Sequence, residues 1–322
     1  MLGGTSGRSM KRFNLVVSLI TEDNDFQQAQ AAAAEQAAQR LGVNVQIIYA
    51  DSDAILQSQQ LLRIIQANVP PRCDAIIFEP AGATGLPQVA RAAAAAGIGW
   101  ATLNRDVDYI PELRRSHRTP MFSIAADHRE IGRTQGKQFA ALLPKGGSVL
   151  YIEGPSQSMA AKGRTCGLSD SKPDNVAIRT MRGHWTEESG YRTISSWLRL
   201  STSRQSQFDM VAAQNDAMAM GARKAFQELP DDSWRARWLC SPFLGCDGLE
   251  QTGQAWVNTG LLTATVVSAP MAGQAVEMMT RALTTGINPP EHTLMAQHSY
   301  PSIENLAASR AAHTRASLSA GA

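Results

Sequence analysis

Residues 208–226 read FDMVAAQNDAMAMGARKAF. A short apolar run ends in three polar residues, and a Met- and Ala-rich stretch with helical spacing follows at once. This order of strand, polar junction and helix is typical of the βαβ units of an open α/β sheet. We therefore expect Asn215 and Asp216 at the carboxyl end of a buried strand, where ligands bind in such sheets. Either residue could instead only cap the helix that follows.

The same alternation of short apolar runs and helical stretches extends on both sides of this segment. A polar, arginine-rich stretch over residues 105–120 separates two such series. The pattern predicts an α/β fold of two doubly wound parallel-sheet lobes. We predict strands over 13–20, 43–50, 73–80, 97–104, 121–126, 146–154, 175–183, 208–215, 238–247, 261–269 and 293–298, and helices over 25–40, 54–67, 85–96, 127–143, 158–169, 187–200, 216–229 and 271–285.

Length and charge agree with two lobes and limit the partners. The chain has 322 residues, more than one typical domain, and 43% of them are hydrophobic. Lys and Arg total 30 against 28 acidic residues, a net charge of +2. This balance is too small to indicate a nucleic acid or an anionic membrane as partner, and we expect a monomer.

The cysteines do not indicate a metal site, and the amino terminus does not indicate a signal peptide. Cys73, Cys166, Cys240 and Cys246 form no CxxC pair and no Cys/His cluster at zinc spacing, so we expect neither a metal nor another cofactor. The first residues, MLGGTSGRSMKR, have no apolar stretch after their positive charges and do not form a signal peptide as written. The protein is then cytoplasmic, or a periplasmic protein whose leader is absent or removed.

Polar and aromatic residues follow the strands of the first series. Asn24 and Phe26 come before the first helix, and Asn104 and Arg105 end the fourth strand. An amide both donates and accepts, an aromatic ring offers an apolar face, and a guanidinium group binds two neighbouring oxygens. Together these groups match a sugar. The alternatives are a helix cap and core residue for the first pair, and a surface arginine for Arg105.

The second series offers a comparable set. Arg164 and Lys162 lie two residues apart on a predicted helix, so they point to different faces of that helix. One of them can therefore face the crevice at the carboxyl ends of the strands, where ligands bind. Trp185 directly follows a strand, either as a stacking platform or as a cap on the core. Asp247 lies between two glycines in LGCDG, which allow close approach of the backbone, and a carboxylate there can accept two hydroxyl hydrogens.

Catalytic motifs are absent from the sequence. It contains no GxxxxGK[ST], no GxGxxG after the first strand, no GxSxG and no HExxH. The six histidines are scattered. We therefore expect a binding protein and no enzyme.

As an ordered set, the segments DNDF, TLNR, AQNDAMAMGA and GCDG resemble those of the type I periplasmic binding proteins, the ribose- and galactose-type sugar-binding proteins of bacterial ABC importers. The resemblance extends from about Phe13 to about Ile303. It implies reversible capture of a small sugar or polyol between two lobes that close about a hinge, and a membrane permease as partner. The implied ligand-binding residues are Asn24, Phe26, Asn104, Arg105, Arg164, Trp185, Asn215, Asp247 and Ser268.

Three positions depart from the pattern of the family. Asn104 stands where the turn usually has Asp, so that a charged acceptor becomes a mixed donor and acceptor. Ala126 replaces a frequent hydroxyl residue, and Ser268 replaces the longer Gln common in ribose binders. These departures weaken an assignment to ribose itself.

The resemblance also implies lobes that are not simple halves of the chain. The first would hold 13–126 and 269–297, the second 127–268 and 298–308, with tails at 1–12 and 309–322. The chain would cross between them near Ala126, Ser268 and His298. A cytoplasmic sugar sensor like the effector domain of lactose-repressor-type regulators is the alternative function, although only about a dozen residues precede Phe13, too few for a DNA-binding helix-turn-helix.

Overall fold

The computed structural model describes residues 12–67, 70–82 and 84–308. The expected tails, 1–12 and 309–322, therefore lie outside the described residues except for Arg12. The chain forms two compact units. Unit 1 holds the residues up to Glu22 with Gln27–Ala125 and Pro270–Thr293, and unit 2 holds Asp23–Phe26, Ala126–Ala269 and the residues from Leu294 onward.

Unit 1 is built on a six-stranded sheet with the order β11-β5-β4-β3-β1-β2. The neighbours from β2 to β5 are parallel, as expected when helical crossovers join the strands. The strands are β1 (Asn14–Leu19), β2 (Asn44–Tyr49), β3 (Ala75–Phe78), β4 (Gly99–Leu103), β5 (Met121–Ala126) and β11 (His292–Met295).

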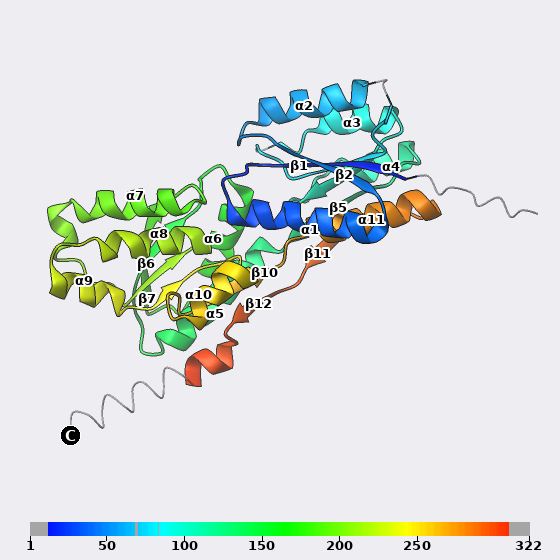
Figure 1. The fold of residues 1–322 in the computed structure, drawn as a ribbon. Coiled ribbons are helices and arrows are strands. Elements are labelled where there is room, and N and C mark those ends of the chain that lie inside the picture. Colours follow the sequence, from blue (N-terminus) through cyan, green and yellow to red (C-terminus); the bar gives the residue numbers. More distant parts are fainter. Residues whose placement is uncertain (1–11, 68–69, 83, 309–322) are drawn as a thin grey trace, which may run out of the picture. The chain divides into compact units, whose positions relative to one another are not determined.

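Helices cover both faces of this sheet (Figure 1). They are α1 (Asp25–Leu41), α2 (Ala54–Gln66), α3 (Pro87–Ala95), α4 (Ile110–Ser116) and α11 (Ala272–Thr285). Phe78 and Trp100, both fully buried, form the centre of the core under α2, α3 and α4, with ring centroids 4.6 Å apart. On the opposite face, Gln30 of α1 accepts hydrogen bonds from the first backbone amides of α11, Met271 and Ala272.

Unit 2 has a four-stranded parallel sheet with the order β7-β6-β8-β9. A separate antiparallel pair joins β10 to β12. The bounds are β6 (Gly147–Glu153), β7 (Val176–Arg182), β8 (Met210–Ala213), β9 (Phe243–Leu244), β10 (Thr265–Ser268) and β12 (Gln297–Tyr300).

Two hydrophobic clusters cover the two faces of the unit 2 sheet. Ile194, Trp197, Phe226 and Trp238 belong to one cluster, and Phe139 and Leu168 to the other. The helices are α5 (His128–Leu142), α6 (Met159–Ser171), α7 (Glu187–Leu198), α8 (Asp216–Gln227), α9 (Asp232–Leu239) and α10 (Ala255–Asn258), with a 3₁₀ turn at Ser201–Ser203 and a π-helical turn at Glu250–Gln254.

Glycines let α5 and α6 approach closely, and this contact fixes the position of α6. A Cβ atom on Gly132 would lie 2.0 Å from the carbonyl oxygen of Arg164, and one on Gly167 would lie 1.8 Å from that of Arg129. Both distances are far below van der Waals contact, so any larger residue would push the helices apart. Because Arg164 belongs to α6, the close packing of α5 on α6 also fixes the position of Arg164 relative to the sheet of unit 2.

The α/β fold of two doubly wound lobes is confirmed, but some of the predicted elements were wrong. The predicted strand 238–247 is reduced to Phe243–Leu244, because Trp238 belongs to α9 and stacks on Phe226 with ring centroids 4.5 Å apart. The predicted strand 293–298 is two strands, β11 and β12, and the polar stretch 105–120 contains α4. Within the described residues, no helix has the length and hydropathy needed to cross a membrane.

Candidate functional site

In unit 2, Arg164 forms the centre of a buried polar cluster. The residue is 6% exposed. Its Nη1 donates to the carbonyl oxygen of Gln214, and its Nη2 lies 3.4 Å from Oδ1 of Asp247. Its guanidinium carbon lies 5.4 Å from the centroid of the Trp185 ring, a cation–π distance. Lys162, by contrast, is exposed, so Arg164 is the residue of that pair that faces the cluster.

Burial and charge act on Arg164 in opposite directions. Burial lowers the pKa of its guanidinium group, but Cys246 and Asp247 raise it and prevail, so the pKa lies above its usual value. Arg164 is therefore a permanent cation and hydrogen-bond donor. A buried cation of this kind needs an acceptor beside it, and Asp247 provides one.

The loop that carries Asp247 is shaped by a second carboxylate, Asp216. Asp216 accepts hydrogen bonds from the backbone amide of Gly248 and the hydroxyl of Thr265, both at 2.7 Å. Burial raises the pKa of Asp216 well above its usual value, and the negative charge of Asp247 raises it further. Asp216 thus stabilises the loop that carries Asp247 through its hydrogen bond to the next residue, Gly248.

Trp185 has a left-handed backbone, φ +69°, and its carbonyl oxygen receives two side-chain amides. Asn215 Nδ2 donates to it at 2.8 Å and Asn24 Nδ2 at 2.9 Å. The indole ring packs against Gly154, where a Cβ atom would lie 2.3 Å from the ring. The position of the ring therefore depends on the space left by Gly154 and on the two asparagines that bind the backbone carbonyl of Trp185.

Both asparagines also use their side-chain oxygens within unit 2. Asn215 Oδ1 caps α8 by accepting from Met218 N at 3.0 Å, and Asn24 Oδ1 accepts from Phe26 N at 2.9 Å. Phe26 is half-buried. Asn215 thus caps α8 with one end of its amide and holds Trp185 with the other.

Ser268 is buried at the end of β10. Its backbone amide donates to the carbonyl oxygen of Asp247 at 2.9 Å. The structure thus brings Arg164, Trp185, Asn215, Asp247 and Ser268 into connected contacts in unit 2, together with Asn24.

In unit 1, Asn104 and Arg105 follow β4, and Asn104 pairs with a residue that the sequence analysis missed. Asn104 Nδ2 donates to Oε1 of Glu79 at 2.9 Å. Burial raises the pKa of Glu79, while the amides of Asn104 and Gln27 act against this shift. Arg105 is half-buried, and burial lowers its pKa although Glu79 opposes the change.

Glu79, Gln214 and Asp216 all come at strand ends, so their position in the sequence was a signal that could have found them. Glu79 follows β3 in IIFEP, and Gln214 follows β8 in VAAQND. Gln214 is fully buried and accepts from Gly154 N at 2.9 Å through its Oε1. The sequence indicates Asp216 only together with Asn215, as a polar residue of the same strand end or as a helix cap.

Three of the expected site residues have an unusual backbone. Among the described residues, six that are not glycine have positive φ, and these include Asn104 at +57°, Trp185 at +69° and Asp247 at +106°. Such conformations cost free energy and cluster at functional sites. The backbone conformation is an observation separate from the chemistry of the side chains. It supports the assignment of the functional site to the region around Asn104 in unit 1 and around Trp185 and Asp247 in unit 2.

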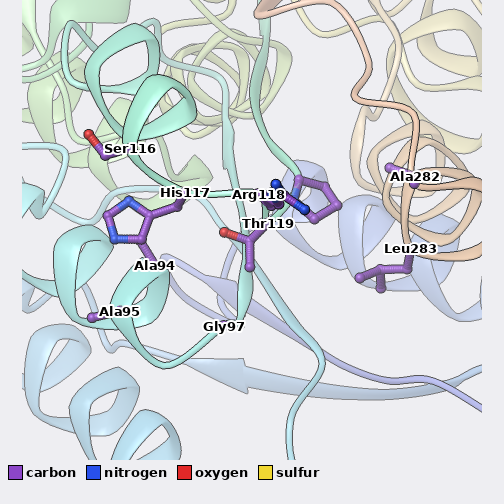
Figure 2. Close-up of a pocket in the computed structure, with 11 residues that line it drawn as sticks. Ala94, Ala95, Gly97, Ser116, His117, Arg118, Thr119, Ala282 and Leu283 are labelled. Carbon is purple, nitrogen blue, oxygen red and sulfur yellow. The ribbon is translucent and has the colours of Figure 1, made fainter.

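A cavity of about 550 Å³ in unit 1 is separate from these residues (Figure 2). Its walls include Gly97 and Pro120, which precede β4 and β5, whereas Asn104 follows β4. The cavity thus lies at the amino ends of these strands, and none of the expected site residues lines it. Over the described ranges, no group of three His, Cys, Asp or Glu side chains could hold a metal ion.

Comparison with known proteins identifies the family. Residues 15–287 match the family described as periplasmic binding protein domain, and the chain belongs to this family. It is 28% identical to a putative rhizopine-binding protein of Rhizobium meliloti over 194 residues, which are 58% of this chain and 58% of that relative. It thus spans less than two thirds of that protein's length.

Two further proteins match over more of the chain. A D-apiose import binding protein of Paraburkholderia graminis is 25% identical over 84% of this chain and 82% of the relative. The structure of a Caulobacter myo-inositol binding protein bound to myo-inositol superposes with a TM-score of 0.76 at 20% identity and covers 92% of this chain and 95% of that one. At this identity the structural match shows the fold.

Proposed function

We propose that this protein is the solute-binding component of an ABC-type importer and that it captures a small sugar or polyol reversibly between its two units. The observation that supports this most is the unit 2 cluster, in which a permanent cation, a carboxylate and an indole ring lie together. A sugar needs donors and acceptors for its hydroxyls and an apolar surface for its C–H face. This cluster offers all three.

Unit 1 would complete the site with Asn104 and Arg105. The ligand favours a closed form because only there do both units contact it, and the chain segments that pass between the units serve as the hinge. Net hydrogen bonds contribute about 0.5–1.5 kcal/mol each. Roughly eight of them suffice for micromolar affinity after the costs of ordering.

Membership of the family supports a wider role in import. Relatives that are import binding proteins support a permease as partner and the periplasm as the place of action. The protein would release its ligand unchanged. A cytoplasmic sensor is the second candidate, and fractionation of the native cell separates the two, since recovery from the periplasm supports import and recovery from the cytosol supports sensing.

The ligand class is tested by a thermal-shift screen with D-ribose, D-apiose, xylitol and myo-inositol, followed by calorimetry. A ligand that binds the folded state raises the melting temperature, and the shift grows with the ratio of ligand concentration to Kd. We expect a shift of several degrees for at least one of the four and one bound molecule per chain. A set of flat responses would contradict the proposed ligand class.

Closure is tested by small-angle X-ray scattering on the same protein. Saturation with the strongest ligand of the screen should decrease the radius of gyration. An unchanged radius at full saturation would show that capture does not need movement of the units.

A further inference from the structure

The carboxyl edge of the unit 1 sheet has an acidic residue one strand away from the expected position. The resemblance to sugar-binding proteins predicts an acid at position 104, and Asn104 stands there instead. Glu79 follows β3 and Asn104 follows β4, and these strands are parallel neighbours with Phe78 paired to Thr102. Glu79 is 4% exposed.

Glu79 is held by amide groups from three directions. Its Oε1 accepts from Asn104 Nδ2 at 2.9 Å, and its Oε2 accepts from Gln27 Nε2 at 2.8 Å. Its backbone carbonyl oxygen accepts from Gln57 Nε2 at 2.8 Å. These contacts fix the carboxylate in one orientation, and its two oxygens face donors.

The carboxylate determines how the amide of Asn104 is turned. If that amide were reversed, its oxygen would lie against a carboxylate oxygen, which repels it. The NH₂ group of Asn104 therefore faces Glu79, and Oδ1 faces the other way. Within the described part of the chain, this Oδ1 is buried and has no hydrogen-bond partner. A buried acceptor without a partner is costly, so a donor from a ligand would stabilise it.

We infer that Glu79 is a positioning residue of the ligand site, whose carboxylate turns Asn104 so that Oδ1 accepts a hydrogen from a ligand hydroxyl group. This inference rests on the proposed function and deepens it. Asn104 then presents an acceptor alone, as an aspartate would, and does not act as a mixed donor and acceptor. The negative charge then belongs to Glu79, which lies behind Asn104 as seen from the ligand and does not contact the ligand itself.

The inference is tested by exchanging the two groups. Asn104→Asp places two carboxylates against each other, and aspartate tolerates the left-handed backbone as asparagine does. Glu79→Gln removes the charge. In Glu79→Gln/Asn104→Asp the new amide can donate to the new carboxylate, which again presents an oxygen to the ligand. Glu277→Gln, an exposed substitution in unit 1, is the matched control.

Affinity for D-ribose, D-apiose, xylitol and myo-inositol is measured by calorimetry at pH 8 and pH 5. We expect Asn104→Asp to lose at least tenfold in affinity at pH 8 and to recover part of it at pH 5, where the two carboxylates share a proton. The double variant should bind within about threefold of the wild type. The charged group that faces Glu79 and Asn104 is Arg105. The other polar side chains around Glu79 are neutral, namely Gln27 and Gln30 of α1, Gln57 of α2 and Ser18 of β1.

The wild type and the four variants are also compared without ligand by their melting temperatures. Asn104→Asp should melt lower than the wild type, more so at pH 8 than at pH 5, and the double variant should regain most of the loss. Wild-type-like binding by Asn104→Asp at pH 8, or a double variant no better than Asn104→Asp, would overturn the inference. If the wild type binds none of the four probes, the proposed ligand class fails, and the melting temperatures alone decide whether Glu79 orients Asn104.

Discussion

The side-chain amide of Asn215 donates a hydrogen bond to the carbonyl oxygen of Trp185 at 2.8 Å, while its oxygen caps α8. One short side chain thus connects the start of a helix to a strained loop residue whose ring lies beside Arg164. Because the two ends of the amide have separate tasks, they can be separated by substitution.

Asn215→Asp keeps the oxygen that caps α8 and loses the donor to Trp185. We expect sugar affinity to fall about tenfold, because the new carboxylate oxygen repels the carbonyl oxygen of Trp185, and Asn24 then holds that carbonyl without the second donor. Calorimetry measures the effect. Asn258→Asp is the control, since Asn258 only accepts from Tyr300 at the surface. Equal affinity of both variants would show that the bond does not matter for binding.

Arg164→Lys keeps the positive charge and loses the planar fork that reaches both Gln214 and Asp247. We expect at least a tenfold loss of affinity and a similar loss for Asp247→Ala. Removing one partner of a buried pair costs about 3–5 kcal/mol of stability, so Arg164→Ala should also lower the free energy of unfolding. Both quantities are measured, by calorimetry and by urea titration. Wild-type binding in Arg164→Lys and in Asp247→Ala would remove these residues from the site.

Gly154→Ala tests the placement of the indole ring. The added methyl group would lie 2.3 Å from Trp185, so the ring must move. We expect weaker sugar binding and a changed tryptophan emission spectrum. The control is Gly42→Ala, which meets nothing within 4 Å and imposes only backbone strain at φ +67°. A ligand affinity equal to that of the control would show that the ring position is not critical.

Asp216→Asn tests the buried carboxylate by its pH dependence. The pKa of Asp216 is raised in the folded state, so its contribution to stability is full below the unfolded pKa and is lost as pH rises through the folded pKa. The variant should be less stable at low pH, because it loses an acceptor, and should lose less stability than the wild type as pH rises from 4 to 8. Urea titrations measure this slope. Asp51→Asn, at an exposed turn, should keep the wild-type slope; an unchanged slope in Asp216→Asn would refute the assignment.

The sequence pattern predicted most of the fold because each apolar run and each helical stretch encodes its own local structure. It failed at residues 238–247, where Trp238 is apolar for packing on Phe226 within a helix–helix contact, and not because it belongs to a strand. An apolar run of that length has no periodicity that separates the two cases.

The candidate site was predicted in part. Strand ends indicated Asn104 and Asn215, because parallel strands place their junctions at one edge. The pairing of Asn104 with Glu79 could not be predicted, since it depends on β3 and β4 being neighbours in register. The bonds of Asn24 and Asn215 to one carbonyl oxygen depend on the left-handed turn of Trp185, which the sequence does not indicate for a tryptophan.

The central claim is that both units hold one sugar molecule, and calorimetry on two matched variants tests it most directly. With the strongest ligand of the screen, the wild type should bind one molecule per chain. Arg105→Ala in unit 1 and Asp247→Ala in unit 2 should each weaken that single binding event at least tenfold. If either variant bound with wild-type affinity and stoichiometry, the ligand would not be shared between the two units and the account would be wrong.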